Sequence, residues 1–116
     1  MKLEVGMYVR YKTLSNRIKI AKIIEIDKKV LDLDNKDCTT EKYIIGEASH
    51  NIIDLIEVGD YVNGVQVIDK EIDNVNEKYL QCGVGDYLIC VYNSNEIEDV
   101  VTKEQFKAME YRLGDK

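Results

Sequence analysis

The chain offers few side chains for nucleophilic or general-base catalysis. His50 is the only histidine, and Ser49 directly precedes it. Adjacent side chains in a connector seldom converge, whereas a catalytic triad needs a nucleophile, a base and an orienting group that meet in space. The cysteines Cys38, Cys82 and Cys90 lack both an identifiable base and CxxC spacing. We therefore expect a protein that is not an enzyme, with its cysteines packed in strands.

The sequence does not indicate a metal-binding or phosphate-binding site either. Asp32, Asp34 and Asp37 lie in and beside one predicted hairpin, but they lack the loop, the glycine and the closing glutamate of an EF-hand. The segment Gly83-Val84-Gly85 is too short to cradle a phosphate and leads into a predicted strand. We expect turn chemistry at both places, no metal site and no cofactor.

Binding is the chemistry that the composition favours. Eight tyrosines accompany one phenylalanine and no tryptophan, and tyrosine is common at binding surfaces because it is amphipathic and loses little entropy when immobilised. Four basic residues flank Tyr11 and could meet a phosphate or a nucleotide, namely Arg10, Lys12, Arg17 and Lys19. The candidate binding residues are Arg10, Tyr11, Lys12, Tyr43, His50, Asp60 and Asn63.

The net charge of −6 is unevenly distributed. Residues 1–53 carry ten basic and eight acidic side chains, for a net charge of +2, whereas residues 54–116 carry six and fourteen, for a net charge of −8. An acidic surface repels nucleic-acid phosphates over a Debye length of about 8–10 Å. The second half therefore disfavours nucleic acid and suits a basic surface of another protein, with plain solubility as the alternative interpretation.

Targeting and membrane signals are not recognised in this sequence. It has no apolar run of about 18 residues, and its first residues lack an apolar core followed by a small-residue cleavage site. We expect a cytoplasmic protein without a membrane partner.

Two motifs each occur twice, in the same order, which indicates a tandem duplication. The opening motif LEVGMYV at residues 3–9 recurs as IEVGDYV at residues 56–62. A closing motif, SHNIIDLI at residues 49–56, recurs as SNEIEDVV at residues 94–101. The first unit therefore ends where the second begins, with no linker between them.

Turn residues and alternating apolar positions predict about five short strands in each unit. Asn63-Gly64 is the strongest hairpin signal, because both residues accept positive φ. A change of parity among the apolar residues predicts a β-bulge near Val67. The nearly unbroken apolar run at residues 87–92 predicts a central strand. Each closing motif is expected to end in a strand, at residues 52–56 and 97–101.

These elements predict a mostly β fold of two tandem, fused SH3-like small β-barrels with a short C-terminal helix. The first unit spans residues 1–56, and the second spans residues 57–116 with the helix, for which Thr102 is the N-cap. At the junction, the opposite parity of Leu55 and Val58 predicts that they enter the first and the second core respectively. The alternative is a single larger β-sandwich or meander, in which the repeats pair across a pseudo-dyad.

The stretches SHNIIDLIEVGDYVNG, at residues 49–64, and VTKEQFKAMEYRL, at residues 101–113, carry a further signal. They resemble a group of small uncharacterised proteins encoded in phages and prophages of clostridia and other Firmicutes, over most of the chain. The resemblance implies a phage accessory protein in the host bacterial cytoplasm. Such proteins often bind a host factor, and anti-CRISPR and other anti-defence proteins are the obvious examples.

Three functional hypotheses follow. The first is a non-enzymatic phage or prophage accessory protein that binds a host or phage protein, for example a defence inhibitor that occupies a basic nucleic-acid channel. The second is a protein that binds or sequesters a small ligand such as a nucleotide. The third is a nucleic-acid-binding double barrel that uses its N-terminal unit, which we rank last because of the net charge.

Overall fold

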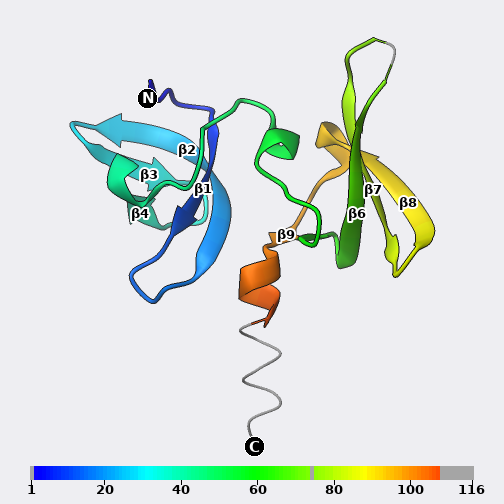
Figure 1. Cartoon of the computed structure of the whole chain (residues 1–116). Coiled ribbons are helices and arrows are strands. Elements are labelled where there is room, and N and C mark those ends of the chain that lie inside the picture. The colour runs from blue at the N-terminus through cyan, green and yellow to red at the C-terminus, as the bar shows by residue number, and fades with distance from the viewer. Residues whose placement is uncertain (1, 74, 108–116) are drawn as a thin grey trace, which may run out of the picture. The chain divides into compact units, whose positions relative to one another are not determined.

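The computed structural model describes residues 2–73 and 75–107, and the chain divides into two units, Met1–Leu55 and Ile56–Lys116 (Figure 1). Strands dominate both units, and residues 103–107 form a short helix. The prediction of a mostly β fold with a short helix is therefore confirmed. Within the described residues, no helix has the length and the apolar character needed to cross a membrane.

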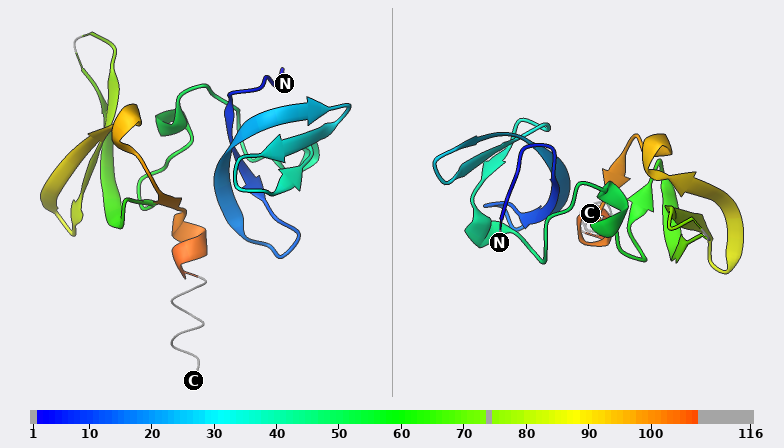
Figure 2. Two further views of the ribbon diagram at one scale, coloured as in Figure 1. Left: turned by 180° about the vertical axis from the view of Figure 1, so that it is seen from behind. Right: turned by 90° about the horizontal axis from the view of Figure 1, so that it is seen from above.

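The first unit is an antiparallel sheet in the order β1-β2-β3-β4, which curls into a half-barrel (Figure 2). After the last strand the chain returns along the outer edge of β1, where Ile44 bridges to Tyr11 and Ser49 bridges to Tyr8. The elements are β1 (Tyr8–Lys12), β2 (Ile18–Asp27), β3 (Val30–Leu33), β4 (Cys38–Thr39) and the 3₁₀ helices η1 (Glu41–Tyr43) and η2 (Ile52–Asp54).

The second unit is a five-stranded sheet in the order β8-β7-β6-β5-β9. A 3₁₀ helix again follows the fourth strand, and the chain again returns along the first strand of its unit, here as a regular paired strand. The elements are β5 (Tyr61–Val62), β6 (Val65–Ile72), β7 (Lys78–Val84), β8 (Tyr87–Asn93), η3 (Ser94–Glu96) and β9 (Val100–Val101).

The repeated opening motif forms the same tight turn in both units. Gly6 and Gly59 have φ values of +95° and +101°, and positive φ at the third position is typical of a type II turn. In each turn the residue after the glycine donates its N–H to the carbonyl of the glutamate, at 3.2 Å in the first unit and 3.0 Å in the second. Glycine is needed at this position because a side chain would strain the backbone.

The same glycines connect each turn to the second strand of its sheet. The Gly6 N–H donates to the Ile23 carbonyl at 2.8 Å, and the Gly59 N–H donates to the Val67 carbonyl at 2.9 Å. A β-bulge follows directly in both strands, because the pairing register shifts after Ile23 and after Val67. The predicted bulge near Val67 is confirmed, and the opening halves of the two units are structural repeats.

The closing motifs, in contrast, occupy different places in the two units. Ser94 begins η3, whereas Ser49 lies beyond η1 and bridges to the first strand. The helix that corresponds to η3 is η1, since each follows the fourth strand of its unit directly and ends at an isoleucine with extended backbone. The predicted equivalence of SHNIIDLI and SNEIEDVV is therefore wrong. A short 3₁₀ helix capped by an asparagine side chain occurs in each region, with Asn51 before residues 52–54 and Asn93 before residues 94–96. The two helices fall at different positions of the two motifs.

The closing strands and the junction also differ from the predictions. Residues 52–54 form η2 instead of a strand, and β9 covers only Val100–Val101. Leu55 is buried as predicted, but the Val58 side chain is 52% exposed. Val58 lies inside the tight turn that begins the second unit, so its side chain points outward whatever its parity.

Each unit buries its core at corresponding positions. Ile23 pairs with Leu33 across β2 and β3, and Val67 pairs with Cys82 across β6 and β7; all four are almost completely buried. The first core consists of Val9, Tyr11, Ala21, Ile23, Leu31 and Leu33. The buried apolar residues on β5, β6 and β7 are Val62, Val67, Leu80 and Cys82. Cys38 is exposed and Cys90 half-buried, so only Cys82 is a fully buried cysteine.

The C-terminal helix is capped as predicted. The Thr102 hydroxyl accepts a hydrogen bond from the Gln105 N–H at 3.1 Å, and the Phe106 ring stacks on Tyr61 with 4.0 Å between centroids. The predicted partner of Phe106 on this helix, Met109, lies outside the described residues.

Candidate functional site

The basic patch predicted around Tyr11 is not formed. Arg10 is buried, and its guanidinium donates to the Leu55 carbonyl at 3.2 Å. Lys19 forms an ion pair with Asp37 at 3.5 Å. Because Arg10 is buried and bonded to the Leu55 carbonyl, it cannot act together with Lys12 on one ligand.

Tyr11 is a core residue whose hydroxyl holds the β3–β4 turn. The hydroxyl donates to Asp37 Oδ2 at 2.5 Å and accepts from Asn35 Nδ2 at 2.7 Å. Burial, and then the hydrogen bond to Asp37, raise the pKa of Tyr11 far above its ordinary value. Tyr11 therefore positions the residues around it and remains neutral.

Asp60 has a structural role in the second unit. It is completely buried, and its carboxylate accepts from the Glu57 N–H at 2.8 Å and from the Lys103 N–H at 2.9 Å. These bonds tie the opening turn to the start of the C-terminal helix.

Asn63 and His50 also lie away from any shared site. Asn63 occupies the hairpin turn with a φ of +51°, and its side-chain oxygen accepts from the N–H groups of Glu98 and Asp99 at 2.9 and 3.0 Å. His50 is exposed, with its ring beside Gly6. The sequence identified both residues, but neither is among the residues that line the hollow beside Tyr11.

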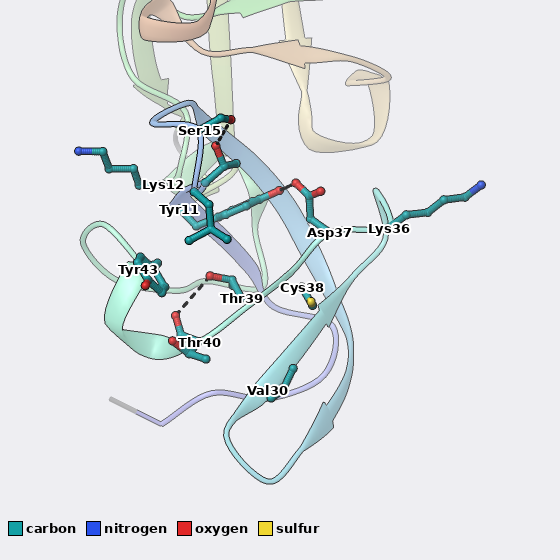
Figure 3. A pocket seen from close by; sticks show the side chains of 12 residues that line it. Tyr11, Lys12, Ser15, Val30, Lys36, Asp37, Cys38, Thr39, Thr40 and Tyr43 are labelled. Atoms are coloured by element: carbon teal, nitrogen blue, oxygen red, sulfur yellow. Dashed lines mark hydrogen bonds between the residues drawn. The ribbon is translucent and has the colours of Figure 1, made fainter.

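Three of the predicted residues, Tyr11, Lys12 and Tyr43, do line one hollow of the first unit, with a volume of about 720 Å³ (Figure 3). Tyr11 forms part of its wall and points toward Asp37, while the Lys12 and Lys36 side chains extend outward on opposite sides. Hydroxyl groups line the same hollow, from Thr13, Ser15, Thr39 and Thr40.

A second hollow of about 520 Å³ adjoins the first, because Thr40 lines both. Lys28, Lys29 and Lys42 line it, together with the apolar side chains of Leu3, Ile26 and Leu31. The two hollows, with Lys12, Lys28, Lys29, Lys36 and Lys42, are called the lysine groove below. Sequence reasoning missed this groove, because its lysines lie on different elements and come together only in the folded sheet.

The second candidate surface is the edge strand β8. The apolar run predicted to be central lies at the margin of its sheet and, within the described residues, pairs only with β7 (Figure 1). The prediction is therefore wrong. Side chains on both faces of the strand are exposed, at 81% for Tyr87, 54% for Leu88, 60% for Ile89 and 45% for Val91.

Comparison of the chain with protein-family models, with curated proteins and with solved structures gave no match. The lysine groove and the exposed edge of β8 are two surfaces of this chain with the chemistry to bind a partner.

Proposed function

We propose that this chain is a non-enzymatic protein-binding module that uses β8 as its docking strand. The observation that carries the proposal is an edge strand with four exposed apolar side chains. Proteins normally protect such edges with charges, bulges or covering segments, because an apolar edge recruits other strands. An edge that carries no charged residue over Tyr87–Asn93 is suited to a partner that completes the sheet.

The partner that fits best is a protein with an extended apolar segment flanked by basic residues. The unit Ile56–Lys116 carries thirteen acidic and six basic residues, for a net charge of −7. Asp86 adjoins β8 directly, and Asp69, Glu71 and Asp73 lie on or directly after β6. The negative potential of these residues attracts a basic segment, whereas a second copy of the chain would bring like charges together.

The proposal includes the fold and the biological setting. Two tandem SH3-like barrels are supported by the order of elements that both units share. In each unit a tight turn precedes four strands with a bulge in the second, a 3₁₀ helix follows, and the chain then returns along the first strand. We further propose that the partner is a host or phage protein. A defence protein with a basic nucleic-acid channel has the surface chemistry that an acidic unit with an apolar edge would recognise.

The test compares Leu88→Thr with Ile24→Thr in the full chain, because both side chains are 54% exposed and only Leu88 lies on β8. Threonine suits strands, so neither change should unfold the sheet. The probe is a labelled peptide of alternating valine and lysine, with octalysine and a valine–glutamate peptide as controls.

We expect the valine–lysine peptide to bind best. Leu88→Thr should weaken it by about tenfold, since burying a leucine contributes about 1.5–3 kcal/mol, and Ile24→Thr should leave it unchanged. Host proteins captured by the wild-type chain and by Ile24→Thr, but not by Leu88→Thr, would then be purified and titrated. Equal binding of the peptide by both variants would contradict the proposal.

A further inference from the structure

The lysine groove concentrates positive charge that the chain as a whole does not have. Five lysines and two acidic residues, Asp37 and Glu41, line it. None of the five lysines forms an ion pair in the part of the chain that the structure describes. Asp37 is already engaged by the Tyr11 hydroxyl and by Lys19. The groove therefore offers uncompensated cations to an anionic ligand.

Two of these lysines occupy backbone positions that lysine does not favour. Lys28 and Lys36 have φ values of +58° and +72°, in the left-handed region where glycine, asparagine and aspartate are preferred. The other non-glycine residues with positive φ among the described residues are all asparagines, at positions 16, 63 and 76. The two exceptions are thus both groove lysines, at turn positions where asparagine would suit the backbone better.

The groove also offers groups that recognise more than charge. Tyr43 lies in η1 and lines the first hollow, half-buried, with the Lys42 ammonium 5.5 Å from its ring centroid. The hydroxyls of Thr13, Ser15 and Thr40 can donate to phosphate oxygens. Binding of single-stranded nucleic acid requires cations placed along the path of the phosphate backbone and an aromatic ring on which a base can stack.

We propose that the lysine groove binds a short stretch of single-stranded DNA or RNA. The net charge of −6 opposes a long duplex, whereas a flexible strand of a few nucleotides can follow two adjoining hollows within one unit. An acidic peptide would satisfy the lysines but would make no use of a stacking surface at Tyr43. This inference is independent of β8, so Leu88→Thr should leave nucleic-acid binding unchanged.

The experiment measures fluorescence polarisation of labelled oligo-dT and oligo-rU, each about eight nucleotides long, with the full chain at about 50 mM salt and above. Binding should weaken steeply with salt, and each groove lysine that contacts a phosphate should contribute about −0.7 to the slope of log K against log salt.

The informative variants are Lys28→Asn and Lys36→Asn. Asparagine suits their positive φ, so each should keep or raise the melting temperature, while the affinity falls and the salt slope becomes shallower by about 0.7. Lys22→Asn makes the same charge change outside the two hollows and should leave binding nearly unchanged. Tyr43→Leu should weaken binding by about tenfold, and Tyr43→Phe should restore it.

The proposal would be overturned if neither oligonucleotide changed the polarisation at the lowest salt. It would also be overturned if Lys22→Asn weakened binding as much as Lys28→Asn and Lys36→Asn do. A third contrary result is displacement of the oligonucleotide by octa-glutamate at equal charge concentration. The last would assign the groove to acidic peptides.

Discussion

Replacing Tyr11 with phenylalanine tests whether its hydroxyl holds the first unit together. The ring stays buried, and only the bonds to Asp37 and Asn35 are lost. A hydrogen bond to a charged group contributes about 1.5–3 kcal/mol, and a neutral one about 0.5–1.5 kcal/mol. The Asp37 side chain is 37% exposed, so water replaces part of the loss. We expect a decrease of about 2 kcal/mol in the free energy of unfolding at neutral pH.

The free energy of unfolding should also depend on pH in a way that differs between wild type and Tyr11→Phe. The pKa of Tyr11 is raised in the folded protein, so its contribution is fully present below the unfolded value of about 10. Above that pH the unfolded chain loses the tyrosine proton first, and stability falls by about 1.4 kcal/mol per pH unit. Tyr11→Phe lacks this decrease. The stabilities of the two proteins should therefore converge between about pH 11 and 12.

Urea unfolding followed by far-UV circular dichroism, at a series of pH values, measures both effects. Tyr79→Phe is the matched control, because its hydroxyl also donates to a carboxylate, Glu71 Oε2, at 2.8 Å. The same hydrogen bond raises the pKa of Tyr79, but water competes at this surface position, so the loss should be smaller. Parallel curves for wild type and Tyr11→Phe above pH 10, or equal losses in the two variants, would refute the reasoning.

Two further predictions concern the glycine turn that begins each unit and the buried carboxylate of Asp60. Gly6→Ala and Gly59→Ala should each destabilise the protein by about 1 kcal/mol or more, because alanine disfavours their positive φ, and Gly59→Ala should cost more because its Cβ would lie 3.2 Å from Lys103 Cδ. Gly85→Asn, at a φ of +59°, is the tolerated control in the same urea titration. Asp60→Asn should cost about 1.5–3 kcal/mol, since an amide accepts only one of its two backbone hydrogen bonds well. Hydrogen exchange at the Lys103 amide should accelerate in Asp60→Asn and not in Asp69→Asn, and unchanged exchange would show that the carboxylate does not hold the helix.

Local features of the sequence were predicted well, because short-range backbone chemistry decides them. Asn63-Gly64 forms the expected turn, since both residues tolerate positive φ. The opening motif repeats its turn, because only glycine suits the third position and the glutamate carbonyl lies within reach of the following N–H. The bulge near Val67 follows from the change of side-chain parity along one strand. Each of these depends on residues a few positions apart.

The candidate surfaces depend instead on which segments lie side by side. The sequence of an apolar run does not distinguish a central strand from an edge strand, and only the pairing order places β8 at the margin of its sheet. Arg10 and Lys12 share a face of β1, but burial directs the Arg10 guanidinium to the Leu55 carbonyl and so keeps it from acting with Lys12. Lysines from β1, two turns and η1 gather around Thr40 only because the first sheet curls. The sequence by itself thus determined the turns, the bulge and the duplicated opening, whereas long-range strand pairing decided which side chains meet.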